Sequence, residues 1–551
     1  MDFKQEIIKE LMKATGQKEI HLEVPPNLEL GDYAFPCFTL AKVFKKAPAE
    51  IAEDLAKKIP LSGIISKIEI KGSYLNFFVN KIFMSKEILT NILKNKNYGS
   101  LNLGKNKKIL VEHTSINPNA SPHVGRARNA LIGDSIVRIL KFQNYEVETH
   151  YFVNDIGKQI AMLVFGAEGK KNIKFDELLK LYVEINKKVE ENPELEKKVF
   201  ELLHKLELND EKTKKSFKKI VEICVKGQTK ILSELDIKYD KFDYESDYLW
   251  DKKTEEILKK LESTKKLFID DEGRKVLNQE GFNLAMKSAV LVLTRADGTS
   301  LYPLRDLAYH VDKKKTENIL VLGEDQKLYH QQITAALSLL KIKPSRVVHY
   351  SFVLLQEGKM STRKGNLVLL EDFMKEALEK AKKEIKKRHD TVKDENAKKI
   401  AYGAIKYAIL KVSADKNVVF NWEQALSFEG DSGPYLQYAY ARIASILKKY
   451  DKKVDEKVDF SLLKEKDEIE LVKLLGNFPS LVKEATEQLK PHIIASYLYN
   501  LSSQFSLFYN ACPVLKAEEN LRNARLVLIE CCQRVLENGL GLLGIDVLEE
   551  M

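Results

Sequence analysis

Short apolar runs that alternate with helical segments constrain the fold of this 551-residue chain more than any other feature. Runs rich in branched apolar residues lie at Ile109–Glu112, Ala289–Leu293, Ile319–Leu322 and Val347–Leu355. Helical segments separate them, as a parallel sheet with crossover helices requires. We therefore predict an α/β fold with a Rossmann-like parallel sheet within residues 106–393.

The first 105 residues mix both kinds of element. The sequence indicates a turn at Gly31-Asp32-Tyr33, a helix near Ala49–Lys58, and strands at Ile68–Lys71 and Tyr74–Val79. Glycine and asparagine then cluster around Tyr98–Asn106, as in a linker. We predict that residues 1–105 form a small α/β domain.

Two further regions have helical periodicity. Between about 170 and 236, Lys, Glu and Leu dominate, which predicts a helical insertion within the parallel-sheet domain. From Asp394 the pattern is helical nearly to the end, interrupted at Pro434, Pro479, Pro491 and Pro513. Residues 394–551 are therefore predicted to form an α-helical bundle, and the whole chain is a multidomain α/β protein.

Composition narrows the class of protein only slightly. Lys and Arg number 90 against 80 Asp and Glu, a net charge of +10 that suits a polyanionic partner but equally an ordinary solvated surface. The five cysteines form no CxxC pair, so neither a disulfide framework nor a zinc site is indicated. Acidic residues within the first ten positions and the lack of a long apolar window predict a soluble, cytoplasmic protein without a membrane span.

The turn after the first predicted strand is suited to binding phosphate. Ser121-Pro122 is a good helix start, which would place His123 and Arg126 in the first turn with Gly125 between them. Unpaired amides, the helix dipole and these two side chains form a plausible site for a triphosphate. The alternative is an ordinary strand-loop-helix unit in which His123 caps its own helix.

A second basic cluster, GKMSTRKGN, follows the run that ends at Leu355. It contains Lys359, Arg363 and Lys364 among glycines and hydroxyl residues, a composition that can close over phosphates. A solvated charged turn is the alternative. Two phosphate-type loops after two buried strands favour a shared nucleotide.

HVGR (His123–Arg126) and KMSTR (Lys359–Arg363) resemble the two ATP-binding signatures of class I aminoacyl-tRNA synthetases. Three other stretches are similar to the arginyl-tRNA synthetases in particular: YFVNDIGKQI, LTRADGTSLYPLRDLAYH and SGPYLQYAYAR. Two positions depart from the pattern, because Arg126 stands where that family usually has histidine and Thr362 where the class usually has lysine.

The resemblance implies the ATP-dependent ligation of L-arginine to tRNA(Arg) through an arginyl-adenylate. It implies ATP binding by His123, Gly125, Lys359, Met360 and Ser361. It also assigns catalysis to His123, Arg126, Lys359, Arg363 and Lys364. Mg²⁺ is expected to arrive with ATP, with no metal site made by the protein.

A site for arginine must pair a flat guanidinium with carboxylates and hold the α-amino and α-carboxylate groups separately. Tyr302 and Asp306 are four residues apart, and Glu112 ends the first strand of the predicted sheet. By resemblance these three hold the guanidinium. The resemblance also assigns Ser115 and Gln326 to the amino group and Asn117 to the carboxylate.

Structural alternatives exist for the three guanidinium-binding candidates. Asp306 could pair with Arg305 or Lys313, Tyr302 could be a half-buried core aromatic, and Glu112 could be a surface charge at a strand end. Only their joint alignment with the nucleotide signatures favours the functional interpretation.

Aromatic and polar residues in SGPYLQYAYAR suit contact with unpaired bases, although such a row is more often core packing. By resemblance Tyr435, Gln437, Tyr438 and Arg442 contact tRNA from an anticodon-binding bundle, and the N-terminal domain contacts the tRNA elbow. We expect a monomer. Two other hypotheses remain. One is another class I synthetase, or an amino-acid-activating relative that no longer charges tRNA. The other is a noncatalytic RNA-binding or scaffold protein that retained the fold.

Overall fold

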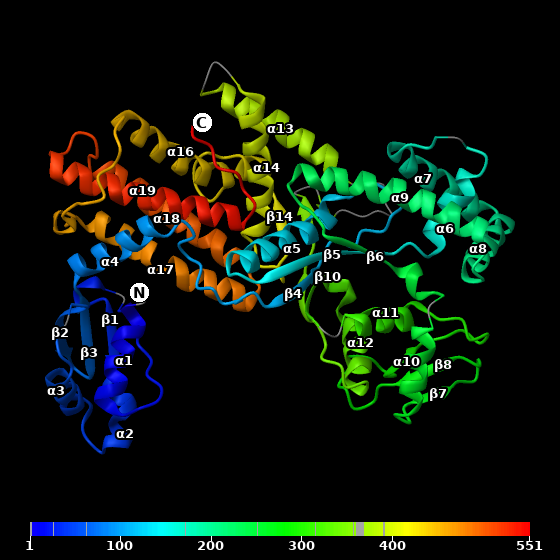
Figure 1. Ribbon diagram of the computed structural model, residues 1–551, viewed down its shortest axis with the longest axis horizontal. Helices are drawn as coiled ribbons and strands as arrows, with labels where there is room; N and C mark the ends of the chain where they lie inside the picture. Colours follow the sequence, from blue (N-terminus) through cyan, green and yellow to red (C-terminus); the bar gives the residue numbers. More distant parts are fainter. Residues whose placement is uncertain are drawn as a thin grey trace.

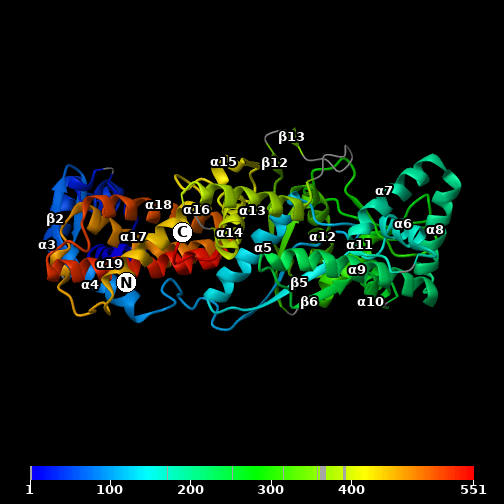
Figure 2. The same ribbon diagram turned by 90° about the horizontal axis from the view of Figure 1, so that it is seen from above.

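The computed structural model describes residues 3–25, 27–61, 63–170, 172–250, 252–313, 316–355, 358–359, 368–388 and 392–551. The molecule is elongated, with the N-terminal unit at one end, the helices within residues 158–207 at the other, and a parallel sheet between them (Figures 1 and 2). Short 3₁₀ helices span Leu28–Leu30, Cys37–Leu40, Glu245–Tyr248, Glu324–Gln326 and Phe460–Leu462.

The N-terminal unit is a small antiparallel sheet covered by helices. Its elements are α1 (Phe3–Thr15), β1 (Tyr33–Pro36), α2 (Ala41–Phe44), α3 (Pro48–Lys58), β2 (Ile65–Lys71), β3 (Tyr74–Val79) and α4 (Lys81–Lys94). The sheet order is β1-β3-β2. Both predicted strands and the predicted helix are confirmed, but the predicted turn at Gly31–Tyr33 leads directly into β1, which pairs Tyr33 with Phe77.

Five of the described strands form a parallel sheet in the order β11-β10-β4-β5-β6. They are β4 (Lys108–Glu112), β5 (Glu146–Val153), β6 (Lys241–Tyr244), β10 (Glu317–Gly323) and β11 (Arg346–Tyr350). The chain extends the sheet in one direction from β4 to β6 and in the other from β10 to β11. A topological switch point therefore lies between β4 and β10, where open α/β sheets bind ligands beyond the carboxyl ends of the strands.

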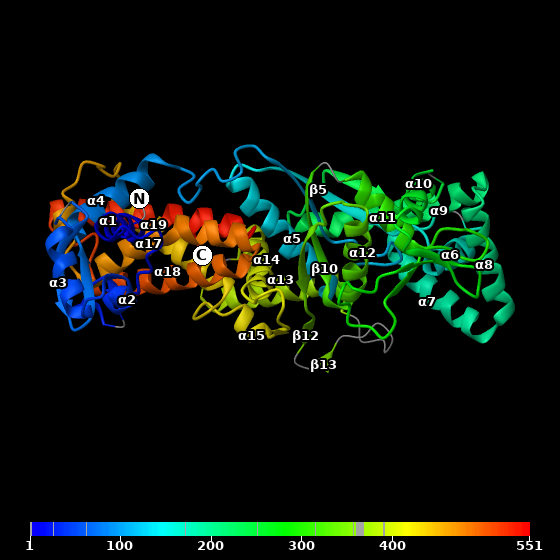
Figure 3. The ribbon, with the colours of Figure 1, turned by 90° about the horizontal axis from the view of Figure 1, so that it is seen from below.

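Helix α5 (Val124–Phe142) and the pair α11 (Tyr302–Asp312) and α12 (Lys327–Leu339) lie on opposite sides of this sheet (Figures 1 and 3). The insertion predicted between 170 and 236 is helical. It consists of α7 (Phe175–Glu191), α8 (Pro193–Glu207) and α9 (Glu211–Glu234), and α6 (Lys158–Ala167) packs against all three.

One predicted parallel strand lies in another sheet, and a second belongs to the parallel sheet only in part. The run Ala289–Leu293 forms β9, in an antiparallel sheet with β7 and β8 beside α10, and not in the parallel sheet. The bounds are α10 (Lys253–Glu262), β7 (Leu267–Ile269), β8 (Lys275–Asn278) and β9 (Val290–Val292). Leu291 and Leu293 pack into a separate apolar cluster with α10, α11 and α12, and this local burial decides their placement.

The run Val347–Leu355 is also not one strand. It breaks at Ser351–Phe352, where the Ser351 N–H donates to the Ala414 carbonyl and the Phe352 N–H to the Asn417 side chain. After the break, β12 (Val353–Leu355) joins a second small sheet with β13 (Gly358–Lys359) and β14 (Val418–Phe420). Strand β14 lies in a region predicted to be helical.

The rest of the chain is mainly helical. The helices are α13 (Leu370–Lys386), α14 (Asp394–Leu410), α15 (Trp422–Ala425), α16 (Gly433–Tyr450), α17 (Lys466–Gln488), α18 (Pro491–Ala511) and α19 (Glu519–Leu542). Pro434 and Pro491 lie in the first turns of α16 and α18, where proline is tolerated. Pro479 does not interrupt the bundle as predicted, because it lies inside α17. Among the described helices, none has both the length and the apolar character needed to cross a bilayer.

Candidate active site

The helix that carries His123 begins later than predicted. Helix α5 starts at Val124, and His123 precedes it with an extended backbone. The Val124 N–H donates to the Val368 carbonyl at 3.1 Å, and the Leu370 N–H donates to the Pro122 carbonyl at 2.8 Å. These strand-like contacts keep the chain extended through Pro122, so the prediction that the helix starts at Ser121-Pro122 is wrong. His123 makes no side-chain capping bond, so the alternative role as a cap is wrong as well.

A cavity of about 190 Å³ opens at this helix start, and we call it the HVGR cavity. It is lined by His123, Gly125, Arg126, Gly323, Asp325, Tyr350, Phe352 and Val353. The residues come from α5 and from the carboxyl ends of β10 and β11. The three predicted residues of the HVGR turn therefore face one hollow at the switch point.

His123 is a neutral hydrogen-bonding group at pH 7. Burial, and to a lesser degree the charge of Arg126, lowers the pKa of His123 to about 4. Its Nδ1 is buried and has no hydrogen-bond partner within the described part of the chain. A Cβ atom on Gly125 would lie 3.1 Å from the imidazole ring, so glycine leaves room for the ring at the helix start. The positive charge expected at this turn therefore comes from Arg126 and the helix dipole.

The second signature begins on the hairpin that follows β12. Backbone pairing of Lys359 with Leu354 forms the short β13 strand. Met360, Ser361, Arg363 and Lys364, together with the departing position Thr362, lie outside the described residues.

A second cavity, of about 280 Å³, lies beside α11 at the carboxyl ends of β4 and β10. We call it the acidic cavity. Five of the six residues predicted to bind arginine line it: Glu112, Ser115, Tyr302, Asp306 and Gln326. The sixth, Asn117, lines a neighbouring side cavity of about 370 Å³ and makes hydrogen bonds of 3.3 Å with Gln159 and with Asn154.

The backbone between Glu112 and Ile116 is strained. Thr114 and Ser115 have φ angles of 83° and 42°, which is rare for non-glycine residues and exceptional for a β-branched one. Asn129 of α5 accepts a 2.7 Å hydrogen bond from the Thr114 N–H, and the Thr114 hydroxyl lies 2.6 Å from the Tyr239 hydroxyl. Strain that the surroundings hold in place is characteristic of functional sites, and here it directs Ser115 into the acidic cavity.

Neighbouring side chains hold the carboxylates of the acidic cavity in place by hydrogen bonds. Glu112 is only 7% exposed and accepts hydrogen bonds from Tyr309 and, at 3.1 Å, from Lys313. It is therefore not a surface charge. Asp306 accepts a 2.8 Å hydrogen bond from Tyr329 and lies 3.4 Å from His310.

The structural alternatives for Asp306 and Tyr302 are wrong as well. Arg305 pairs with Glu245 at 2.9 Å, and Lys313 pairs with Glu112 and Asp243, so neither is the partner of Asp306. The Tyr302 ring is 57% exposed and is not a core aromatic.

The sequence interpretation missed one acidic residue. Glu245 follows β6, lines both the acidic and the side cavity, and is buried. Burial raises the pKa of Glu245 and that of Asp306, so a guanidinium in the cavity would favour their ionised forms. Glu112 was selected because it is a carboxylate at the end of a predicted parallel strand. The same signal did not reveal Glu245, because the sequence of β6, KFDY, is too short and polar to be recognised as a strand.

The residues predicted to contact tRNA do not all reach the surface. Gln437 is 0% exposed, and its amide donates to the carbonyls of Lys399 and Asp546, so the prediction for Gln437 is wrong. It joins α14 to the C-terminal segment. Tyr435 is half-buried, with its hydroxyl 3.2 Å from that of Ser506.

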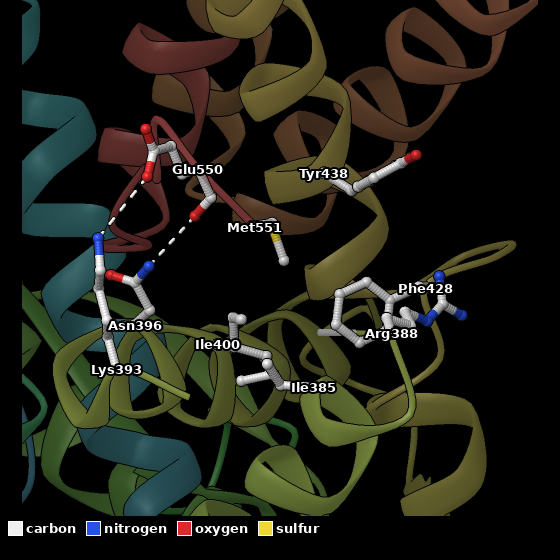
Figure 4. A pocket seen from close by; sticks show the side chains of 9 residues that line it. All are labelled: Ile385, Arg388, Lys393, Asn396, Ile400, Phe428, Tyr438, Glu550 and Met551. Carbon is white, nitrogen blue, oxygen red and sulfur yellow. Dashed lines mark hydrogen bonds and ion pairs between the residues drawn. The ribbon is translucent and has the colours of Figure 1, made fainter. Parts of the chain in front are cut away.

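Tyr438 and Arg442 form a half-buried pair. The guanidinium of Arg442 donates to the Tyr438 hydroxyl at 2.6 Å and stacks on that ring. Tyr438 lines a cavity of about 330 Å³ in the bundle, together with Arg388, Phe428 and the C-terminal Met551 (Figure 4). Aromatic and cationic groups around one hollow suit a nucleic-acid base.

The parallel sheet, the HVGR turn at its switch point and the KMSTR sequence after β12 define a class I aminoacyl-tRNA synthetase. Comparisons with known proteins identify the family. A family model for the catalytic domain of class I (R) tRNA synthetases matches residues 88–422. Models for the DALR anticodon-binding domain and the arginyl-tRNA synthetase N-terminal domain match residues 436–551 and 1–79.

Similar proteins agree over the full length. The chain is 41% identical to an arginine–tRNA ligase of Methanocaldococcus jannaschii, covering 99% of each sequence. It is 40% identical to one of Methanococcus maripaludis, covering 98% of this chain and 97% of the relative. The Thermus thermophilus arginyl-tRNA synthetase structure superposes with a TM-score of 0.84 at 29% identity and full coverage of both chains. The chain belongs to the arginyl-tRNA synthetase family.

Proposed function

We propose that the protein uses ATP to ligate L-arginine to tRNA(Arg) through an arginyl-adenylate. The observation that carries this proposal is the acidic cavity, where three carboxyl groups face one hollow beside the HVGR cavity. Glu112 and Glu245 are buried, and Asp306 is half-buried. Glu112 and Glu245 also pair with Lys313 and Arg305, so Asp306 is the carboxylate most available to a substrate. A guanidinium suits this cavity because it brings both positive charge and several hydrogen-bond donors.

In the proposed binding mode, Tyr302, Asp306 and Glu112 hold the guanidinium, with Glu245 as a fourth contact. Ser115 and Gln326 bind the α-amino group, and both line the same cavity. Asn117 binds the α-carboxylate from the adjoining side cavity.

The chemistry requires no covalent enzyme intermediate. The arginine carboxylate attacks the α-phosphorus of ATP, pyrophosphate leaves, and a terminal ribose hydroxyl of tRNA then attacks the adenylate carbonyl and releases AMP. Catalysis consists of positioning and charge stabilisation. His123 and Gly125 would contact the nucleotide, Arg126 would bind its phosphates, and Lys359, Met360, Ser361, Arg363 and Lys364 would close over them. Mg²⁺ would arrive with ATP.

We place the tRNA contacts on Tyr435, Tyr438 and Arg442 of α16 and on the N-terminal unit. We propose domain limits near residues 105 and 393, because no helix or strand is described between α4 and β4 and because α14 packs on α16 and α18. The catalytic-domain family match ends later, at residue 422, and would include α14. Limited proteolysis would decide between these limits.

We also propose a cytoplasmic monomer. Residues of one chain line both cavities, so no second copy is needed to complete the site. All five cysteines are buried thiols without disulfides, as expected in a reducing compartment. Light scattering of the purified protein would test the monomer.

The function is tested by charging an unfractionated tRNA pool with each of several labelled amino acids, in the presence of ATP and Mg²⁺. We expect arginine alone to become acid-precipitable. Charging with another amino acid would contradict the assignment of the acidic cavity. Amino-acid-dependent pyrophosphate exchange without charging would instead identify a relative that activates arginine but does not transfer it.

A further inference from the structure

Arg128 is the largest completely buried side chain in the described part of the chain, at 0% exposure. It lies on α5, five residues after His123, and its guanidinium is bound by backbone carbonyls. Nη1 donates to the Ser351 carbonyl at 2.6 Å and to the Phe352 carbonyl at 3.4 Å, and Nη2 donates to the Ser413 carbonyl at 2.9 Å. Within the described ranges, no carboxylate forms an ion pair with it, and burial lowers the pKa of Arg128 to about 10.

Stability alone does not account for a cation in this position. A buried charge without a counter-ion is costly, and an apolar side chain of similar length would fill the same space at lower cost. A guanidinium differs from such a side chain because its donors form a rigid planar fork. The fork fixes the relative positions of the groups that it contacts.

Those groups belong to two segments that lie far apart in the sequence, so Arg128 connects both of them to α5. One segment is the break at Ser351–Phe352 between β11 and β12, and the other is the loop Ser413–Asn417 after α14. The two segments are also bonded to each other. The Ser351 N–H donates to the Ala414 carbonyl at 2.8 Å, and the Phe352 N–H donates to Asn417 Oδ1 at 3.0 Å.

The Ser351–Phe352 break also forms part of the HVGR cavity. Tyr350, Phe352 and Val353 line one wall, and His123 together with Gly125 and Arg126 of α5 lines another. Beyond the break, β12 leads to β13 and the KMSTR sequence. Arg128 therefore connects α5, which carries one wall of this cavity, to the Ser351–Phe352 segment, which carries the other.

We propose that Arg128 is a positioning residue for adenylate formation. It sets the distance between the HVGR turn and the strand that leads into KMSTR, and it couples that strand to the loop Ser413–Asn417 at the start of the helical region. Its effect acts on ATP and not on arginine, because the acidic cavity lies on the other side of β4 and β10. This inference rests on the proposed function.

The test compares Arg128→Met, which keeps the length and removes the fork, with Arg128→Lys, which keeps the charge without the fork. Pyrophosphate exchange in the presence of tRNA gives kcat and the KM for ATP, and equilibrium dialysis gives the Kd for labelled arginine. We expect both variants to raise the KM for ATP at least fivefold. For Arg128→Met, kcat/KM for ATP should fall roughly 100-fold, as expected for a displacement of about 1 Å. The Kd for arginine should stay within twofold.

Leu528→Ala is the matched control, since Leu528 is completely buried on α19 in the helical bundle. It should lower the Tm and leave the KM for ATP unchanged. Asn417→Ala, at an exposed position, removes only the bond to Phe352 and should raise the KM for ATP about twofold even if Arg128→Met does not fold.

Three results would overturn the proposal. The first is an unchanged KM for ATP in folded Arg128→Met, or in Asn417→Ala if Arg128→Met does not fold. The second is full recovery by Arg128→Lys, which would show that charge alone suffices. The third is an equal loss of ATP and arginine binding. If the protein activated no amino acid at all, wild-type exchange would already be absent, so failure of the proposed function would be recognised before any variant is compared.

Discussion

The acidic cavity and the HVGR cavity share the carboxyl edge of one sheet but are built from different groups. Buried ionisable side chains, each anchored by a second side chain, define the acidic cavity. The HVGR cavity combines two glycines and a neutral imidazole with the cationic Arg126 and with aromatic and aliphatic side chains that follow β10 and β11. The difference matches two tasks, since one site selects a cation by charge and the other holds phosphates at a helix start. Side-chain changes should therefore act most strongly in the acidic cavity.

The largest effect is expected for Asp306→Asn. The substitution keeps the shape but removes a buried charge opposite the guanidinium, which costs about 2–5 kcal/mol. We expect kcat/KM for arginine to fall roughly 1000-fold, with the KM for ATP within twofold. Steady-state charging kinetics at saturating ATP and at saturating arginine measure the two values. A comparable rise in the KM for ATP would show that the two cavities are not separate.

The second effect in size is that of His123→Ala. Removing one positioned donor from the phosphates should lower kcat for adenylate formation roughly 100-fold. The Kd for arginine should be nearly unchanged, and His123→Gln should retain part of the rate because an amide also donates. Single-turnover adenylate formation and arginine dialysis measure the two quantities. Equal losses in both would contradict a role confined to the nucleotide.

Acid should destabilise both cavities through their buried imidazoles. Burial lowers the pKa of His123 and of His330 to about 4, against 6.5 in the unfolded chain. Between pH 6.5 and 4 the unfolded chain therefore binds more protons, so the free energy of unfolding falls as the pH falls. At pH 5 each histidine should account for about 2 kcal/mol of this loss.

Urea unfolding of the wild type and of His123→Asn at pH 7.5 and 5.0 measures the loss. The variant should lose about 2 kcal/mol less than the wild type. If the wild type and the variant lose the same amount, His123 is not a buried neutral group in solution.

The smallest effect is expected for Gly125→Ala. The new methyl group would lie 3.1 Å from the His123 ring, a contact that a small rotation of the ring can relieve. We expect a three- to tenfold rise in the KM for ATP, equal to about 1 kcal/mol, and no change in the Tm beyond about 2 °C. Gly541→Ala, where a methyl group meets no atom within 4 Å, is the control. A Gly125→Ala enzyme with wild-type kinetics would show that the ring position is not critical.

The sequence predicted elements well where the signal is local. The apolar run at Ile109–Glu112 and the periodicity that follows it specify β4 and α5, and the four-residue spacing of Tyr302 and Asp306 holds on α11. The sequence did not predict which neighbouring strands a given strand pairs with. Val290–Val292 carries the same branched apolar composition as a parallel strand, and only its packing with Leu277 and α11 decides otherwise.

The candidate site could likewise be predicted where the signal is local, and not where it depends on packing between distant segments. Residues at the ends of recognisable strands were found, whereas Glu245 was missed because β6 has only four residues. Gln437 was misassigned because aromatic neighbours do not reveal which side of a helix is buried. Ser121-Pro122 has the local pattern of a helix start. The contacts that keep it extended come from residues 368–370, which are too far along the chain to be predicted from the local sequence.

The docking of α4 on the bundle has a consequence for synthesis. Arg534 of α19 donates to the Ile92 and Leu93 carbonyls at the end of α4, across 442 and 441 positions of sequence, and the Cys531 thiol lies on the Leu89 carbonyl. At typical elongation rates, roughly 20 to 90 seconds separate the emergence of these partners from the ribosome. During that interval the apolar face of α4, with Ile88, Leu89 and Ile92, has no bundle to cover it. Helix α4 can therefore complete its packing only late in synthesis, and we expect its exposed apolar face to be a site where chaperones bind the nascent chain.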